Sequence, residues 1–427
     1  MTESLLERSA RFIDGAVYEG PESVNPVDGS FHEIADGLGL VCGFSHIWSL
    51  DAGEGLVVVD TSQPDFASAA VEHLRQWRDV PVDTIVYTHG HMDHVSGSRV
   101  FRDDAAGRRR SLPEVVAHDA VGQRLDRYGI TRGYNEVVNA RQFGWRYRAG
   151  SFDVDWIKPQ VTYSDGLDLE VGETRMQLIH EKGETDDHTI AWVPQQGILL
   201  TGDLIIWAFP NAGNPQKAQR YPAEWAAALR RMIDLRPSLL APAHGLPIAG
   251  AERIGRVLDD TATALEGLVA DTLAMMNGGA PLDEILHTVR VPQDLLERPY
   301  LRPSYDEPEF VVRNIWRLYG GWHDANPARL KPAPEAAVAA EVAAMAGGAA
   351  ALARRAVELC EAGELRLACQ LVEWAAQAAP ADTEVHAARA EVYRIRRGSE
   401  LSLMARNIFR DAHCASKARV QPEPPPD

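Results

Sequence analysis

Short apolar runs separated by turn residues dominate the first part of the chain and predict β-strands. The runs LVVVDTS, ending at Ser62, and TIVYTH, ending at His89, are rich in β-branched residues. Between them, residues 67–79 read ASAAVEHLRQWRD, with apolar side chains at helical spacing. Strand, helix and strand in this order indicate a parallel βαβ unit.

The same kind of pattern continues to about residue 250. A helix is predicted over 222–235, where Pro222 suits the first turn. Further strands, each a short apolar run beside turn residues, are predicted at 167–180, 188–194, 197–203 and 238–244. Residues 1–252 therefore predict an α/β domain with two β-rich halves.

The composition changes after this domain. Residues 253–333 begin with a predicted helix and become rich in proline and aromatic residues, which indicates an ordered connector. Residues 334–415 are Ala-rich and helical, and two of their helices resemble one tetratricopeptide-like pair. One pair is too short for a solenoid, so we expect it to pack against the α/β domain or a second subunit. The tail, 416–427, is expected to be disordered.

The charge balance excludes two classes of partner. The chain has 43 basic and 61 acidic residues, a net charge of −18. Generic nucleic-acid binding and adsorption to an anionic membrane both need basic patches, so neither is expected. No apolar run of about 18 residues and no apolar leader segment are present, so we expect a cytoplasmic protein. The four cysteines form no CxxC pair and are expected to be reduced.

The strongest chemical signal is the sequence THGHMDH directly after a predicted strand. It places His89, His91, Asp93 and His94 within six residues. Imidazole nitrogens and carboxylate oxygens are zinc ligands, and a metal would satisfy so many crowded polar groups. The alternative is a solvated polar loop, which does not explain the density of ligating groups.

This HxHxDH pattern resembles the signature of the metallo-β-lactamase superfamily of dinuclear hydrolases. Three later segments fit the order expected in that superfamily: GETDDH, GILLTGD and LLAPAHG, which supply His188, Asp203 and His244. The resemblance covers about residues 30–250 and implies an αββα sandwich.

The resemblance also implies how the ligands are shared. One metal would be held by His89, His91 and His188, the other by Asp93, His94 and His244, with Asp203 bridging. Asp93 and Asp203 are the implied catalytic carboxylates. Two metals with open positions activate water for hydrolysis. Zinc is expected, two ions per chain, although Fe or Mn also suits nitrogen and oxygen donors.

Other polar residues near these motifs are candidates to orient the ligands: Asp60, Thr88, His180 and Asp187. We interpret six of the histidines outside the motifs as structural: His46, His73, His118, His287, His386 and His413.

A second resemblance is to the type III zinc alkylsulfatases. Residues 305–334 and the following helices resemble their dimerisation region, residues 209–225 their sulfate-site loop, and residues 124–144 the insertion over their active site. The resemblance implies a dimeric, α-helical C-terminal region and hydrolysis of an anionic alkyl sulfate. The implied substrate-binding residues are Asn214, Lys217, Arg220, Tyr128 and Tyr134. Alternatively, Lys217 and Arg220 are simply solvated residues before a helix.

Two departures from the alkylsulfatase pattern leave the substrate open. That family has carboxylates where we place His188 and Asp203, and it continues into a sterol-carrier-like domain that we expect to be absent here. A phosphoester, thioester, lactone or activated ether therefore remains an alternative substrate. A non-enzymatic, metal-binding scaffold subunit of a hetero-oligomer is a further alternative.

Overall fold

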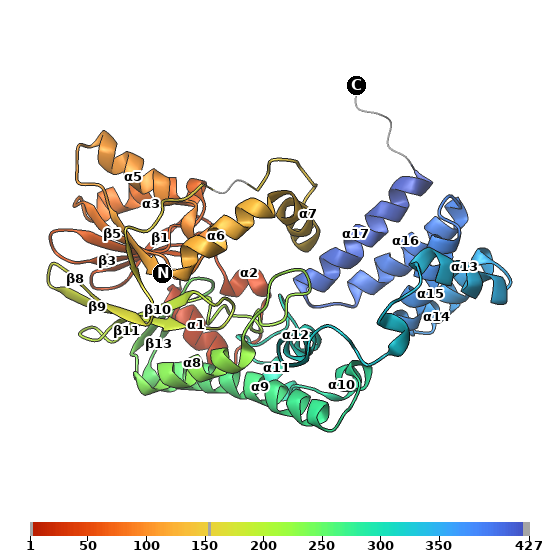
Figure 1. Cartoon of the computed structure of the whole chain (residues 1–427). Helices are drawn as coiled ribbons and strands as arrows, with labels where there is room; N and C mark the ends of the chain where they lie inside the picture. Colours follow the sequence, from red (N-terminus) through yellow and green to blue (C-terminus); the bar gives the residue numbers. More distant parts are fainter. Residues whose placement is uncertain (1–2, 153–154, 422–427) are drawn as a thin grey trace. The chain divides into compact units, whose positions relative to one another are not determined.

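Two β-sheets form the centre of the N-terminal part of the chain (Figure 1). In the computed structural model, which describes residues 3–152 and 155–421, the first sheet has seven strands in the order β1-β2-β3-β4-β5-β6-β7. Strands β1 to β4 pair antiparallel, and β4 to β7 pair parallel. The strands are β1 Phe31–Ala35, β2 Leu38–Val41, β3 Ile47–Asp51, β4 Leu56–Val59, β5 Val82–Val86, β6 Glu114–His118 and β7 Val161–Tyr163.

The second sheet has six strands in the order β13-β12-β11-β10-β9-β8 within the same described ranges. All its pairs are antiparallel except β11 with β12, which are parallel. Its strands are β8 Gly166–Val171, β9 Thr174–Glu181, β10 His188–Val193, β11 Ile198–Gly202, β12 Leu239–Pro242 and β13 Ile248–Ala249.

Strand β4 shows why this part of the chain folds into four layers. All four of its residues are apolar and buried. Successive side chains of a strand point to opposite faces. Accordingly, Leu56 and Val58 join the core under the outer helices, while Val57 and Val59 join the core shared with the second sheet. The predicted αββα sandwich is confirmed.

Helices cover both outer faces of the sandwich. Helix α3, Pro64–Trp77, joins β4 to β5 and completes the predicted parallel βαβ unit. It buries Ala67, Ala70, Val71 and Leu74, the i, i+3, i+4, i+7 stripe of an amphipathic helix. Helix α8, Pro222–Asp234, begins at the predicted proline. The other helices of this part are α1 Leu5–Ile13, α2 Pro21–Val24, α4 Met92–Val95, α5 Ser98–Gly107, α6 Ala120–Ile130, α9 Ala251–Asn277, α10 Leu282–Thr288, α11 Gln293–Leu296 and α12 Pro308–Gly320.

The contacts divide the chain into two units at positions that differ from the predicted boundaries. The first unit comprises residues 1–132 and 152–321, and the second 133–151 and 322–427. Most of the predicted connector, 253–333, therefore belongs to the sandwich unit. The reason is burial: Leu258 and Leu265 of α9 and Val311 of α12 join the sandwich core.

The second unit is helical. Its own cores contain small side chains such as Ala356, Ala368 and Ala375, which lets the helices approach closely. Its elements are α7 Arg132–Phe143, the 3-10 turn Pro327–Arg329, α13 Glu335–Met345, α14 Ala349–Glu361, α15 Leu365–Ala378, α16 Thr383–Gly398 and α17 Leu403–Val420. Helix α17 continues to Val420, so residues 416–420 of the predicted tail are helical, and residues 422–427 lie outside the described residues.

Helix α7 reaches this unit from the middle of the sandwich sequence. The side chain of Asn407 donates a hydrogen bond to the carbonyl of Gln142 (2.9 Å), and Arg410 donates one to the carbonyl of Gly144 (2.6 Å). An ion pair joins Arg141 to Asp411 at 3.2 Å. Part of the predicted active-site insertion is therefore a component of the helical unit.

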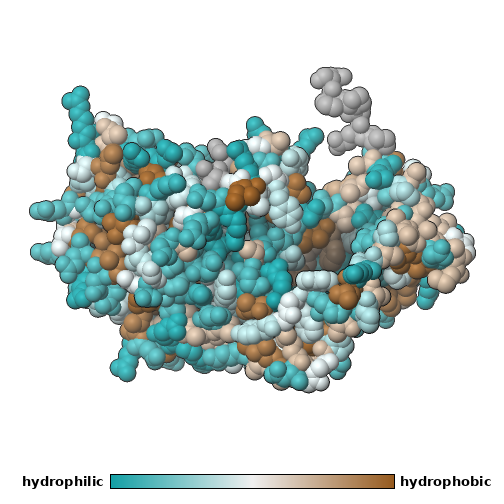
Figure 2. Space-filling view, in the orientation of Figure 1, coloured by the Kyte–Doolittle hydropathy of each residue, from teal (hydrophilic) through white to brown (hydrophobic). Residues whose placement is uncertain are grey.

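The surface differs between the units. Figure 2 shows mostly hydrophilic side chains over the sandwich and more pale brown, weakly apolar area over the Ala-rich helices. Large apolar side chains exposed in the helical unit include Met345, Leu367 and Leu401. Over residues 3–152 and 155–421, no single helix is long and apolar enough to cross a membrane. Within the same residues, helices α13 and α14 are long and apolar enough only when they are taken as a pair, and the chain bends by 85° between them.

Candidate metal centre

Six of the seven predicted ligands lie in segments that follow strands at one edge of the sandwich, whereas His188 is the first residue of β10. The segment Thr88–His94 follows β5, Asp203 follows β11, and His244 follows β12. Loops after the carboxyl ends of parallel strands gather at the same edge of a sheet. The two sheets are also tied together there, because the amide of Thr189 donates to the carbonyl of Thr88 at 2.7 Å.

The side chains meet in two groups among the described residues: His89, His91, Glu184 and Asp203 in one, and Asp93, His94 and His244 in the other. In each group the ligand atoms lie within 4.8 Å of one another. Asp203 faces both groups. Its Oδ2 lies 3.7 Å from His89 Nε2, and its Oδ1 lies 3.4 Å from His94 Nε2 and 3.5 Å from His244 Nε2.

These spacings fit divalent metal ions. Asp93 Oδ2 lies 3.4 Å from His244 Nε2 and 3.5 Å from His94 Nε2. Ligands on a tetrahedron with bonds of about 2.1 Å are about 3.4 Å apart. In addition, His94 Nε2 and Asp203 Oδ1 are buried and have no hydrogen-bond partner in the described part of the chain. A cation between the side chains would satisfy both atoms.

A buried carboxylate fixes the orientation of His94. Its Nδ1 donates to Asp60 Oδ2 at 2.7 Å, which leaves Nε2 for a metal. Asp60 in turn accepts hydrogen bonds from the amide and the hydroxyl of Thr88, both at 2.8 Å. Asp60 has φ 58°, so the chain turns sharply where β4 ends. Asp60 and Thr88 thus lie where we expected residues that orient the ligands.

The structure does not bring His188 into either group, although we predicted it as a ligand of the first metal. Its Nε2 accepts a hydrogen bond from the amide of Asp203 at 3.1 Å, so that lone pair is already engaged. Its ring stacks on that of His89, with centroids 5.0 Å apart. His188 therefore packs behind the two ligand groups.

Glu184 stands in the first group instead, four positions earlier in the same GETDDH segment. It lies in the loop between β9 and β10, and its Oε1 is 3.9 Å from His91 Nδ1. The sequence did contain a signal, because the alkylsulfatase pattern has a carboxylate in this region. We aligned that carboxylate with His188 and so missed Glu184.

Arg220 and Asn211 surround Glu184. Arg220 is buried and donates to the backbone carbonyl of Glu184 at 3.0 Å and to its Oε1 at 3.1 Å. The side-chain amide of Asn211 donates to the same Oε1. We predicted Arg220 as a substrate donor, and the structure shows that two of its nitrogens hold Glu184. Its Nε is buried and lacks a partner among the described residues.

The other predicted substrate-binding residues have different surroundings. Asn214 is 4% exposed, and its side chain donates to Asn211 Oδ1 at 3.4 Å. Burial, together with the nearby charge of Arg220, lowers the pKa of Lys217 to about 8. The ring of Tyr128 on α6 has its centroid 6.4 Å from that of His91. Tyr134 belongs to the helical unit, where it is 62% exposed.

The electrostatics suit metal binding. Burial, with the neighbouring imidazoles, holds the pKa of His89 well below its usual range, so the ring is neutral. Burial alone would raise the pKa of Asp93, but His94 and His244 outweigh it and lower the pKa to about 2. Burial would likewise lower the pKa of His94, yet Asp203 and Asp60 raise it well above its usual value. Without a metal, His94 holds a proton that a cation would displace.

Asp187 supports the backbone between the first two histidines. Its Oδ2 accepts the amide of Gly90 at 2.9 Å, and its Oδ1 pairs with Arg124 Nε at 3.0 Å. A side chain at position 90 would meet Asp187 Oδ2 at 2.9 Å and Arg124 Cδ at 3.0 Å. We expected Asp187 to orient an imidazole. It holds the loop backbone instead, and only glycine fits beneath it.

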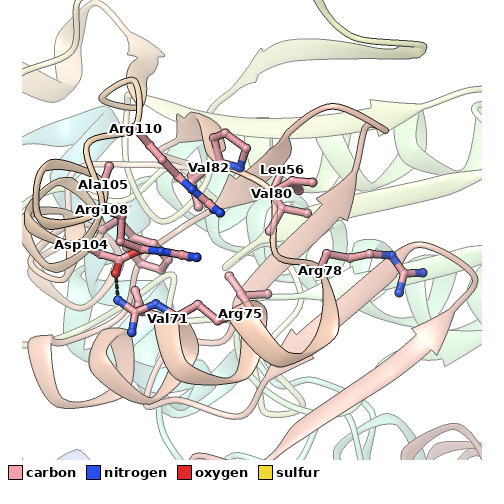
Figure 3. Close-up of a pocket in the computed structure, with 13 residues that line it drawn as sticks. Leu56, Val71, Arg75, Arg78, Val80, Val82, Asp104, Ala105, Arg108 and Arg110 are labelled. Atoms are coloured by element: carbon pink, nitrogen blue, oxygen red, sulfur yellow. Dashed lines mark ion pairs between the residues drawn. The ribbon is translucent and has the colours of Figure 1, made fainter.

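A hollow beside α3 and α5 is separate from the two ligand groups. Four of its lining residues are arginines, namely Arg75, Arg78, Arg108 and Arg110 (Figure 3). All four pair with carboxylates: Arg75 with Asp104, Arg78 with Asp51, and both Arg108 and Arg110 with Asp79. None of the candidate metal ligands is among the described residues that line it, so this hollow is not the metal centre.

An αββα sandwich with two His and carboxylate groups at one edge defines the class of metallo-β-lactamase-fold proteins. Residues 40–244 match the family model described as the metallo-beta-lactamase superfamily. Residues 281–418 match the model described as alkyl sulfatase dimerisation. The chain thus combines a metallo-β-lactamase superfamily domain with an alkyl sulfatase dimerisation domain.

Several of the proteins similar to this chain are alkylsulfatases. The chain is 27% identical to a linear primary-alkylsulfatase of Pseudomonas sp. The alignment covers 70% of this chain and 60% of that protein. The chain is 28% identical to an (R)-specific secondary-alkylsulfatase of Pseudomonas sp. over 80% of its length, but only 55% of that protein. The chain therefore spans less than two thirds of either relative. A solved structure of a stereoselective inverting sec-alkylsulfatase from Pseudomonas sp. shares the fold, with a TM-score of 0.82, 21% identity, and coverage of 97% of this chain and 70% of that one.

Proposed function

We propose that this chain is a dinuclear metal-dependent hydrolase of alkyl sulfate esters. One observation carries the proposal: the two oxygens of Asp203 face two separate groups of ligands. A carboxylate in that position could be shared by two cations, and a pair of cations with open positions would be suited to catalysis rather than to a structural role. The alkylsulfatase relatives support the choice of sulfate ester.

The ligand set that we propose differs from the predicted one at a single position. His89, His91 and Glu184 would hold the first metal, and Asp93, His94 and His244 the second, with Asp203 shared. When bound, two zinc ions would supply a hydroxide at neutral pH and polarise the ester. Nitrogen and oxygen donors also accept Fe or Mn, and metal analysis decides between them.

The residues around Glu184 would bind the sulfate head group. Arg220 Nε is a buried donor without a hydrogen-bond partner within residues 3–152 and 155–421, and a guanidinium binds oxyanions strongly. Lys217 adds a second positive charge in the same loop. Burial raises the pKa of Tyr128, so its hydroxyl stays protonated and can donate to a sulfate oxygen. Asp93 and Asp203 are the carboxylates that we assign to the reacting centre.

We also propose that the protein is a homodimer formed through its helical unit. The match to the dimerisation model supports this, as do the exposed apolar side chains Met345, Leu367 and Leu401. We propose a cytoplasmic location as well, in which the cysteines would stay reduced.

A hydrolysis panel with zinc-loaded protein tests the function. It should contain alkyl sulfates of several lengths, aryl sulfates, phosphate esters, thioesters, lactones and activated ethers. We expect turnover of alkyl sulfates and about two metals per chain by elemental analysis. Turnover of a neutral ester alone would contradict the sulfatase proposal, and a chain that binds metal but hydrolyses nothing would support the scaffold alternative.

A further inference from the structure

A buried carboxylate outside the metallo-β-lactamase match anchors the loop between β11 and α8. Asp306 is fully buried, and its Oδ2 accepts the amides of Gly213 (2.7 Å) and Asn214 (3.0 Å). The loop lies directly against the start of α12, since a Cβ on Gly213 would come within 2.5 Å of the backbone of Phe310 and Val311. Asp306 therefore fixes the first half of the loop.

An asparagine on α12 anchors the two ends of the same loop. The side-chain amide of Asn314 donates to the carbonyls of Ala212 (2.8 Å) and Arg220 (3.0 Å). Its Oδ1 accepts a hydrogen bond from Gln219 at 2.9 Å. Asn314 is 4% exposed, so these bonds are protected from water. The segment from position 212 to position 220 is thus held at both ends by one side chain.

Both anchors lead to Glu184. From Asp306, the path runs through the backbone and side chain of Asn214 to Asn211, which donates to Glu184 Oε1. From Asn314, the path runs through the backbone of Arg220 to its guanidinium, which donates to the carbonyl and the carboxylate of Glu184.

We propose that Asp306 and Asn314 are positioning residues for Glu184. They hold the loop so that Arg220 and Asn211 present the Glu184 carboxylate to the first metal. The inference rests on the proposed function, in which Glu184 is a metal ligand. Both residues lie after residue 244, where the metallo-β-lactamase match ends, and within the 281–418 match. The dimerisation region thus also completes the metal centre of its own chain.

The test uses two isosteric variants of the full chain. The Asp306 carboxylate accepts hydrogen bonds from three backbone amides, and Asp306→Asn leaves only one oxygen to accept them. Asn314→Asp removes both donors and places a charge beside two carbonyls. Asp260→Asn is the matched control, because Asp260 also accepts a side-chain hydrogen bond, from Tyr300, but on α9 and away from the loop.

Zinc and cobalt are titrated into the metal-free proteins against a competing chelator. We expect each test variant to lose about 10- to 100-fold in affinity for one of the two metals, as for other residues that orient ligands. The affinity of each test variant for the other metal should stay at the parent value. Both metal affinities of the control variant should also be unchanged. Selective loss of one metal excludes general destabilisation, which thermal unfolding checks in parallel.

The inference would be overturned if Asp306→Asn and Asn314→Asp bound both metals with the affinities of the parent. It would also be overturned if the affinities for both metals fell by the same factor. If the parent binds two metals but hydrolyses no alkyl sulfate, the proposed substrate fails while the titration still decides this inference. If the parent binds no metal at all, both proposals fail.

Discussion

Arg220 donates two hydrogen bonds to Glu184. One terminal nitrogen donates to the backbone carbonyl of Glu184 at 3.0 Å, and the other donates to its carboxylate at 3.1 Å. Both side chains are nearly inaccessible to water, at 3% and 4% exposure. Removing one member of a buried ion pair leaves an uncompensated charge, which typically costs about 3–5 kcal/mol. The guanidinium therefore sets the position of the carboxylate beside His91.

The variant Arg220→Lys tests this relationship. A lysine keeps the charge but cannot donate from a planar fork to two acceptors. We expect kcat/KM for an alkyl sulfate to fall about ten- to a hundred-fold, the equivalent of about 1.5–3 kcal/mol for a charged hydrogen bond. Steady-state kinetics on the zinc-loaded variant measure the loss. Kinetics equal to those of the parent would contradict the assigned role.

Glu184→Gln and His188→Gln separate the two candidates for the third ligand of the first metal. Glutamine at 184 loses the anionic donor, so we expect about one metal per chain instead of two. Glutamine at 188 can still accept the amide of Asp203, so we expect two metals and at most a modest loss of stability. Elemental analysis after dialysis gives both counts. The opposite pattern would restore His188 as the ligand.

Asp203→Asn tests the shared carboxylate. The amide has no charge and one acceptor oxygen, so it cannot hold two cations together. We expect turnover to fall by at least about two orders of magnitude, with an unchanged far-UV spectrum because the residue lies in a loop. Asp203→Asn protein that keeps two metals and full activity would exclude a bridging role.

Lys217 predicts a pH dependence for anionic substrates. Burial lowers its pKa to about 8, so the ammonium loses its proton, and its attraction for sulfate, as the pH rises through 8. KM for an alkyl sulfate should therefore rise above pH 8, and Lys217→Arg should remove that rise because arginine stays charged. A neutral lactone serves as the control substrate. The same rise in Lys217→Arg would assign the titration to another group.

Truncation after Gly321 tests the role of the helical unit. It removes the partners of α7 while retaining Asp306 and Asn314. Light scattering of the full chain should give twice the 46.9 kDa monomer mass. The truncated chain should be monomeric or aggregated, since the second unit loses most of its core. A full chain that stays monomeric at micromolar concentration would contradict the dimer proposal.

The sequence predicted the sandwich well because its signals were local. Strand β4 and helix α3 could be recognised from apolar periodicity, and the HxHxDH loop from ligand density alone. Asp203 lies between the two groups, and its bridging role, which the superfamily resemblance implied, stays a prediction.

The missed features depend on long-range packing. Whether Glu184 or His188 enters the ligand group depends on how the loop after β9 turns, and that loop is contacted by Arg220 from another loop, which donates two hydrogen bonds to Glu184. The attachment of residues 253–321 to the sandwich and of α7 to the helical unit likewise depends on contacts between distant segments. A single sequence contains no local signal for such pairings.

The position of α7 in the chain has a consequence for synthesis. The hydrogen bond from the side chain of Asn407 to the carbonyl of Gln142 joins residues that are 265 positions apart in the sequence. At translation rates of about 5–20 residues per second, α7 waits roughly 13–50 seconds for α17 to emerge. During that time α7 cannot reach its final partners, whereas β4, α3 and β5 are already available to each other. The final packing of α7 therefore has to follow the synthesis of α17, long after the surrounding strands of the sandwich have been made.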